Sequence, residues 1–92
     1  MAQFQLEIFT QEKRVFDGPV DALTAPGEEG YLGVLAHHAP LLTTLGRGKL
    51  TVRVQNKQTE YALAGGFLEV HDNKATVLAD KLEEEPSQPQ RP

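Results

Sequence analysis

The sequence contains no cysteine, and this absence removes several classes of function at once. Without thiols, the chain forms no disulfide, has no thiolate nucleophile and cannot bind zinc through sulfur. Serine is nearly absent too, because Ser87 is the only one and lies close to the C-terminal end. The composition therefore argues against thiol and serine chemistry and fits a reducing compartment.

Basic clusters and long apolar runs are also missing. Lysines and arginines are scattered singly apart from Lys13-Arg14, and the formal net charge is −4. Nucleic-acid binding needs a clustered basic face, so we expect none. The longest apolar stretch, Tyr61 to Leu68, is far shorter than the roughly twenty residues of a spanning helix. Because MAQFQLEIFT lacks the pattern of a signal peptide, we expect a soluble, intracellular protein that meets a membrane only through a partner.

Hydrophobic side chains instead recur at every second position of a chain of 92 residues, which is the length of one modest domain. Phe4, Leu6 and Ile8 alternate with polar residues, and so do Leu50, Val52 and Val54. This period is typical of strands with one buried face. Further short strands are expected at Arg14–Phe16, Val20–Ala25, Tyr31–Leu35, Glu60–Leu63, Phe67–His71 and Ala75–Ala79. The pattern predicts an antiparallel sandwich or barrel.

Turn-forming residues separate these expected strands. They occur at Asp17-Gly18-Pro19, Pro26-Gly27, Gly46-Arg47-Gly48, Asn56-Lys57 and Asp72-Asn73. Gly65-Gly66 lies between two further strands, where a bulge or a sharp corner is more consistent than a ligand site. No stretch before residue 80 has a sustained helical period, so we expect no substantial helix there.

The last segment, KLEEEPSQPQRP (Lys81–Pro92), differs in composition from the rest. It has three prolines, no glycine and a single apolar side chain, Leu82. Such a segment buries too little apolar surface to offset the entropy of ordering it. We therefore expect a β domain at residues 1–82 and a disordered, acidic, proline-rich tail at 83–92. Within the tail, Glu83 to Glu85 can at most begin a helix that Pro86 ends.

Histidines offer the main candidates for a metal site: His37, His38 and His71, with Asp72 beside the last. Zinc needs three or four converging ligands. Because adjacent strand residues point to opposite faces, His37 and His38 are not expected to share one ion. We expect a surface position for His37 and a packed, hydrogen-bonded one for His38. Metal, cofactor and catalytic residues are therefore not expected, and a small metal-dependent enzyme is kept as an alternative that metal analysis would test.

A carrier domain of the lipoyl or biotinyl type is the second alternative. These domains are small β-sandwiches with a modified lysine at a hairpin tip, and Lys74 follows the expected turn Asp72-Asn73. The usual tip places the lysine directly after Asp or Met, whereas Asn73 intervenes here. A solvated hairpin lysine explains Lys74 better, and intact-mass measurement would separate the two.

Two long segments resemble one family. They are FQLEIFTQEKRVFDGPVDALTAPGEEGYLGVLAHHAPLLTTLGRGKL and YALAGGFLEVHDNKATVLAD. Together they resemble the N-terminal domain of the epsilon subunit of F-type ATP synthases, called delta in mitochondria. The match spans residues 4–80 in one register, and its positions are Phe16, Gly18, Val20, Gly27, Gly30, Leu32, Gly33, Val34, Leu35, His38, Ala39, Pro40, Leu41, Leu42, Gly65, Gly66, Phe67, Glu69, Val70, Thr76, Val77, Leu78 and Ala79.

The resemblance implies a flattened antiparallel β-sandwich of about ten short strands. It also implies a noncatalytic rotor subunit that is bound to the gamma subunit and rests on the membrane c-ring. The stretch GEEGYLGVLAHHAPLL would then be a contact surface rather than an active site. The resemblance places Glu28, Glu29 and Tyr31 at the c-ring. It places Thr10, His38 and Thr43 near gamma.

The chain departs from the family pattern in two ways. Ala36 stands where the family usually has proline. The family also usually continues beyond the equivalent of Asp80 into a pair of C-terminal helices, which act as an inhibitory arm. Here an acidic tail takes their place, so we expect a coupling subunit without that arm. It should sit peripherally on the cytoplasmic face of the cell inner membrane, or on an organellar membrane in a eukaryote.

Overall fold

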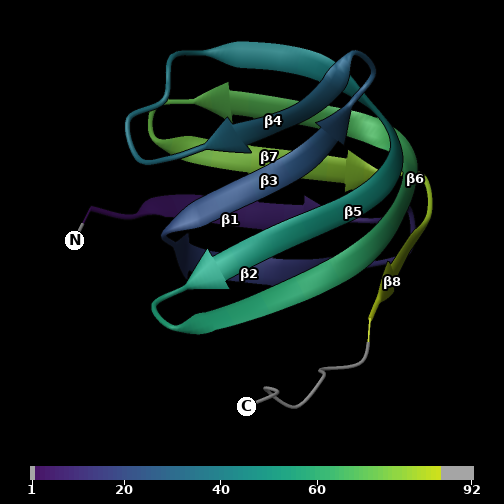
Figure 1. The fold of residues 1–92 in the computed structure, drawn as a ribbon, viewed down its shortest axis with the longest axis horizontal. Helices are drawn as coiled ribbons and strands as arrows, with labels where there is room; N and C mark the ends of the chain where they lie inside the picture. Colours follow the sequence, from purple (N-terminus) through teal and green to yellow (C-terminus); the bar gives the residue numbers. More distant parts are fainter. Residues whose placement is uncertain (1, 86–92) are drawn as a thin grey trace.

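The computed structural model describes residues 2–85 as a single sheet of eight strands without helices (Figure 1). The strands are β1 (Phe4–Phe9), β2 (Arg14–Val20), β3 (Ala22–Gly27), β4 (Gly30–Val34), β5 (Leu41–Val54), β6 (Lys57–His71), β7 (Lys74–Ala79) and β8 (Leu82–Glu84). Their order is β2-β1-β7-β6-β5-β3-β4, and β8 pairs with β6. The all-β class expected from the alternating pattern is confirmed.

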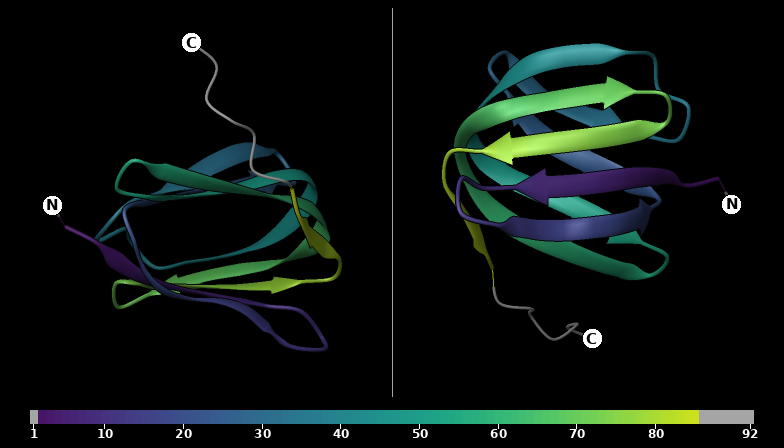
Figure 2. Two further views of the ribbon diagram at one scale, coloured as in Figure 1. Left: turned by 90° about the horizontal axis from the view of Figure 1, so that it is seen from below. Right: turned by 180° about the vertical axis from the view of Figure 1, so that it is seen from behind.

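The sheet folds over on itself into two layers, which Figure 2 shows from below. One layer contains β1, β2 and β7, and the other contains β3 and β4 (Figures 1 and 2). All pairings are antiparallel except one, because β1 and β7 run parallel. The sequence pattern predicted an antiparallel sandwich or barrel, and the β1–β7 pair is the one departure from it among residues 2–85.

The long strands β5 and β6 join the two layers, and they explain why the structure describes eight strands rather than about ten. Their pairing runs from Leu41↔Val70 to Val54↔Lys57 without a shift in register. The expected turn at Gly46-Arg47-Gly48 is therefore wrong, because the chain bends there without reversing. The corner expected at Gly65-Gly66 is confirmed.

The corner in β6 requires glycine at both positions, Gly65 and Gly66. Gly65 and Gly66 have φ angles of 84° and 147°, which residues with side chains rarely adopt. A Cβ at Gly66 would also overlap the carbonyl oxygen of Leu78 on the neighbouring strand. The bend thus depends on the missing side chain and on a close approach between backbones.

β2 is an edge strand that runs through a sequence expected to be a turn. Gly18 and Pro19 pair with Leu6 and Gln5 of β1. Proline lacks an N–H, and edge strands tolerate it because one side of the strand has no partner. Position in the sheet has therefore overridden the local turn signal.

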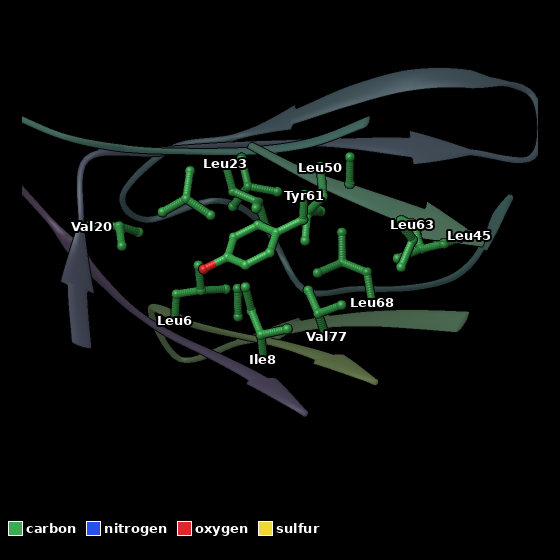
Figure 3. Close-up of a cluster of buried hydrophobic side chains, with 14 of the residues drawn as sticks. Leu6, Ile8, Val20, Leu23, Leu45, Leu50, Tyr61, Leu63, Leu68 and Val77 are labelled. Carbon is green, nitrogen blue, oxygen red and sulfur yellow. The ribbon is translucent and has the colours of Figure 1, made fainter. Parts of the chain in front are cut away.

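The core lies between the layers and is entirely apolar in the part of the chain that the structure describes. Tyr61 occupies its centre, with Leu6 and Ile8 on one side and Leu23 on the other (Figure 3). Burial raises the pKa of Tyr61, because the phenolate would be poorly solvated there. Val52 is 1% exposed, so the inner face predicted for its strand is correct.

β8 includes Glu83 and Glu84, which the composition places in the tail. It pairs with Tyr61–Leu63, a stretch of β6 that β7 does not reach because the β6–β7 pairing begins at Gly66. Leu82 packs against the core, and the amide of Glu85 donates to the carbonyl of Glu60 at 2.8 Å. The side of β6 that faces away from β5 thus orders residues that have little apolar surface of their own. Residues 86–92 of the expected tail lie outside the described part of the chain.

Candidate functional site

The acidic pair Glu28-Glu29 forms the tip of the hairpin between β3 and β4. Gly27 and Gly30 are the closing pair of this hairpin, and both glutamates between them are exposed. Neither carboxylate forms an ion pair with any residue from 2 to 85. The tip therefore exposes two adjacent negative charges, and its contact with a partner stays a prediction.

Tyr31 follows this tip, and it has a structural role that the sequence did not indicate. Although its side chain is 60% exposed, its hydroxyl accepts a hydrogen bond of 2.9 Å from the amide of Lys49 on β5. That amide has no partner on β3, because the β3–β5 register shifts between Thr24 and Gly27. The ring lies so close to Gly48 that a side chain there would clash with the hydroxyl. Tyr31 therefore fastens the tip hairpin to β5.

His37 and His38 lie in the connection between β4 and β5. His37 is exposed, has a φ of 65° and donates its amide to the Asn73 side chain at 2.7 Å. His38 is partly buried, and its Nδ1 lies 2.7 Å from the carbonyl oxygen of Ala39. These positions agree with the surface histidine and the hydrogen-bonded histidine predicted from the sequence.

Asn73 holds this connection in place. Besides accepting from His37, its side chain donates to the carbonyl of Gln3 at 3.0 Å, and its own carbonyl accepts from the amide of Gln5 at 3.1 Å. One residue of the β6–β7 turn therefore anchors both the histidine loop and the first strand. Its φ of 59° suits asparagine, which tolerates this conformation.

Thr10 lies at the other end of the molecule, directly after β1. Its hydroxyl accepts from the amides of Glu12 and Lys13 at 3.3 Å, which closes the β1–β2 hairpin. Because β1 and β7 run parallel, Thr10 and Asn73 lie at opposite ends of these strands, roughly 20 Å apart at the usual rise per residue. The structure therefore does not bring Thr10 and His38 together, although the resemblance implies one partner for both.

Thr43 lies on β5, opposite Leu68, near the end of the sheet that carries the histidine loop. Its side chain is partly buried, and its hydroxyl donates to the carbonyl of Thr44 at 3.4 Å. The residues expected at gamma thus mark two ends of one layer of the sheet.

Between these ends lies an apolar row that the sequence analysis missed. It consists of Phe9 on β1, Leu78 on β7, Phe67 on β6 and Leu42 on β5. Phe67, Leu78 and Phe9 are direct neighbours across three strands, and Leu42 lies diagonally beside Phe67. Leu42 is 72% exposed, Phe67 50% and Leu78 52%, while Phe9 is partly buried. A contiguous apolar surface of this kind is typical of a protein interface.

The sequence does carry a signal for this row. Each of the four strands contains two adjacent apolar residues that break the alternation: Ile8-Phe9, Leu41-Leu42, Phe67-Leu68 and Val77-Leu78. Since neighbouring strand residues face opposite sides, one member of each pair must point outward. An apolar pair in an otherwise alternating strand therefore predicts a second, exposed apolar face.

Charged side chains border the apolar row. The carboxylate of Glu7 lies 3.0 Å from the Lys74 ammonium and 3.9 Å from the Arg14 guanidinium. The Arg14 guanidinium also lies 3.3 Å from the Asp17 carboxylate. Glu69 has no ion-pair partner among residues 2–85. Lys74, the lysine of the carrier alternative, is the first residue of β7 and forms an ion pair with Glu7.

Lys49 links the tip hairpin to the end of the described chain. Its ammonium lies 3.3 Å from Glu60 and 3.5 Å from Glu85, and its amide is the group that Tyr31 binds. The hydrogen bond and charge of Glu60, with the charge of Glu85, raise the pKa of Lys49. No His, Asp or Glu side chains among residues 2–85 cluster in threes as metal ligands.

Residues 3–85 match the family described as "ATP synthase, Delta/Epsilon chain, beta-sandwich domain". The chain belongs to this family. The epsilon chain of Pelotomaculum thermopropionicum is 48% identical over 79 residues, which cover 86% of this chain and 59% of the relative. That of Carboxydothermus hydrogenoformans is 47% identical over 81 residues, covering 88% and 60%. The chain thus spans about three fifths of these ATP synthase epsilon chains.

Solved structures of the family share the fold. A chain in the Euglena gracilis mitochondrial ATP synthase (OSCP/F1/c-ring) superimposes with a TM-score of 0.86 at 30% identity, covering 91% of this chain and 54% of that one. A chain in the central stalk and c-ring of the Tetrahymena thermophila mitochondrial enzyme gives 0.73 at 26% identity, covering 86% and 64%. The family resemblance predicted from the sequence is confirmed. Within residues 2–85, no helix is long and apolar enough to cross a bilayer.

Proposed function

We propose that this chain is a noncatalytic rotor subunit of an F-type ATP synthase, linking the gamma subunit to the c-ring and so coupling ion translocation to ATP synthesis. The observation that carries the proposal is a pair of separate exposed surfaces on one domain, each with a composition that suits a protein interface. One is the acidic tip of the β3–β4 hairpin, and the other is the apolar row across β1, β7, β6 and β5. A linker between two partners needs two such surfaces.

The acidic tip is the surface proposed for the c-ring. Glu28 and Glu29 are exposed and unpaired within the described chain, so they are available to basic or polar loops. Tyr31 holds the hairpin in place, and such preorganisation reduces the entropy lost on binding. Tyr31 therefore contributes to the contact chiefly by positioning the two carboxylates.

The apolar row is the surface proposed for gamma. Thr10 follows Phe9 at one end of the row, and Thr43 precedes Thr44, the neighbour of Phe67, at the other. His38 lies beyond this second end. Interfaces usually bury an apolar centre within a polar rim, and the row with its bordering charges has that composition. Gamma should accordingly present apolar side chains with a basic residue opposite Glu69.

The chain itself is proposed to lack catalytic activity and a cofactor. Its place is peripheral, on the cytoplasmic face of the cell inner membrane, or on an organellar membrane in a eukaryote. The effect of the segment after β8 on ATP hydrolysis is tested by reconstituting the ATP synthase with residues 1–85, which keep β8, or with residues 1–92. Equal ATP hydrolysis is expected, whereas a several-fold rise with the shorter chain would identify the tail as an inhibitor.

The two surfaces are tested separately in a reconstituted complex. The double variant Phe67→Ser/Leu78→Ser should lose co-purification with gamma, while Glu28→Gln/Glu29→Gln should keep gamma and weaken retention of the c-ring. Leu35→Ser is the matched control, since Leu35 is 60% exposed but lies outside both surfaces. Wild-type binding of both partners by both double variants would count against the assignment.

A further inference from the structure

The two edges of the sheet differ in how they are protected. Exposed strand edges invite pairing with other chains, and proteins usually block them with charges, proline or bulges. The edge strand β2 carries such features, because Arg14, Asp17 and Pro19 lie within it and its pairing with β1 is irregular. The other edge strand, β4, has the sequence GYLGV, with neither charge nor proline.

The backbone groups of β4 that face away from β3 follow from its register. Opposed residues in an antiparallel pair alternate between hydrogen-bonded and non-hydrogen-bonded pairs. Tyr31 is opposite Pro26, which has no N–H and cannot complete a hydrogen-bonded pair. Alternation then makes Gly33, opposite Thr24, a non-hydrogen-bonded position as well. Tyr31 and Gly33 therefore direct their N–H and C=O groups toward the free edge.

These groups are accessible and held in position. Tyr31 and Gly33 are both exposed, and by the register with β3 their amides point away from the sheet. The hydroxyl of Tyr31 binds the amide of Lys49, so the strand is fixed against β5 before any partner arrives. An ordered edge with open donors and acceptors is the arrangement that strand addition uses.

The negative charge beside the free edge of β4 favours a partner segment that carries positive charge. Glu28 and Glu29 immediately precede β4 and form no ion pair within the described chain. We propose that the free edge of β4 binds an extended segment of another protein chain, which adds to the sheet as an extra strand and carries lysine or arginine next to the Glu28-Glu29 turn. This inference goes beyond the proposed function, because contact of the acidic tip with a c-ring requires no strand addition.

The test uses the full 92-residue chain labelled with nitrogen-15 and a synthetic peptide, KKVTVTVT. Binding should shift the amide resonances of Tyr31 and Gly33 and slow their hydrogen exchange, while the amides of β2 stay unchanged. Gly33→Pro removes the backbone N–H of residue 33 from the edge, and Gly33→Ala keeps it. The alanine side chain fits, because the nearest atom to its Cβ would be the Leu23 carbonyl oxygen at 4.0 Å. The proline variant should bind about tenfold more weakly than the alanine variant.

Two further peptides sharpen the result. EEVTVTVT should bind several-fold more weakly than KKVTVTVT at low salt, and KKVTPTVT should not protect the edge amides. Equal affinity of the acidic and basic peptides, equal affinity of the two Gly33 variants, or no binding at millimolar peptide would each overturn the proposal. Concentration-dependent dimerisation that Gly33→Pro abolishes would also overturn it, by making a second copy of this chain the occupant.

Discussion

The two faces of the layer formed by β1, β7 and parts of β5 and β6 are both apolar, but only one of them is buried. Leu68 and Val77 are fully buried, whereas their sequence neighbours Phe67 and Leu78 are about half exposed. The neighbours are equally apolar and lie on the same strands, so only the side of the sheet differs. The inner face explains why the domain folds, and the outer face offers a surface that folding does not require.

The largest contrast is expected when charge is placed on each face. Val52→Asp should prevent folding, because the carboxylate would be buried in an apolar core without a partner. Leu42→Asp is the matched change on the outer face, where the side chain is 72% exposed, and it should leave the domain folded. Circular dichroism and thermal unfolding check both variants. A cooperative transition in Val52→Asp like that of the wild type would mean that the faces are wrongly assigned.

Truncation within one apolar pair separates the faces more finely. Leu68→Ala should lower the free energy of unfolding by about 2–5 kcal/mol, as for other buried leucines. Phe67→Ala should lower it by less than about 1 kcal/mol and weaken binding to gamma instead, because half of its side chain already contacts water. Urea unfolding and a gamma pull-down measure the two effects. Similar losses of stability in both variants would contradict the division.

Tyr31 is an exposed residue that we expect to contribute to stability, unlike Phe67 and Leu42. Tyr31→Phe removes only the hydroxyl that binds the Lys49 amide, which should cost about 1 kcal/mol. Hydrogen exchange at Lys49 should also become faster in this variant. Tyr31→Ala should cost more, since the ring over Gly48 is lost too. Unchanged exchange at Lys49 in both variants would assign Tyr31 to binding only.

The smallest effect concerns acid stability at Asp21, a partly buried residue at the surface. Its carboxylate accepts hydrogen bonds from the amide of Gln55 and the side chain of Gln3, and chiefly the first lowers its pKa below the ordinary 3.8. A lowered pKa in the folded state gives stability that is complete above pH 3.8 and is lost as the pH falls through the folded value. Asp21→Asn should therefore flatten the loss of stability below pH 4.

The control for this experiment is Glu12→Gln, because the carboxylate of Glu12 lies in the β1–β2 loop and forms no hydrogen bond within residues 2–85. Urea unfolding of the three proteins at neutral and acidic pH gives the comparison. The same pH dependence in Asp21→Asn and in the wild type would show that the Gln55 contact carries no stability.

Local patterns in the sequence predicted much of the fold. Alternation located the strands, and the asparagine and glycine signals at Asp72-Asn73 and Gly65-Gly66 marked a real turn and a real corner. The same local signals failed at Gly46-Arg47-Gly48 and at Asp17-Gly18-Pro19. Whether glycine or proline ends a strand depends on the strand beside it, and a local pattern contains no information about that neighbour.

The candidate surfaces were predictable to different degrees. The acidic tip could be found because Glu28 and Glu29 sit between glycines in one short stretch. The apolar row could not be assembled, because its members come from four strands whose order was unknown, although each apolar pair marked its own strand. The hydrogen bond between the Tyr31 hydroxyl and the Lys49 amide depends on a register shift between β3 and β5. No feature of the sequence near Tyr31 predicts that shift.

The parallel pairing of β1 with β7 has a consequence for how the chain is made. Gln5 of β1 is paired with Lys74 of β7. β1 therefore cannot form this pairing until almost the whole described chain has been synthesised. At roughly 5–20 residues per second, a ribosome leaves this strand without that neighbour for several seconds. During that time β1 is paired only with β2, so its other edge stays open. Final closure of the sheet must then follow release of most of the chain, and long-range pairing of this kind is among the slower steps in folding.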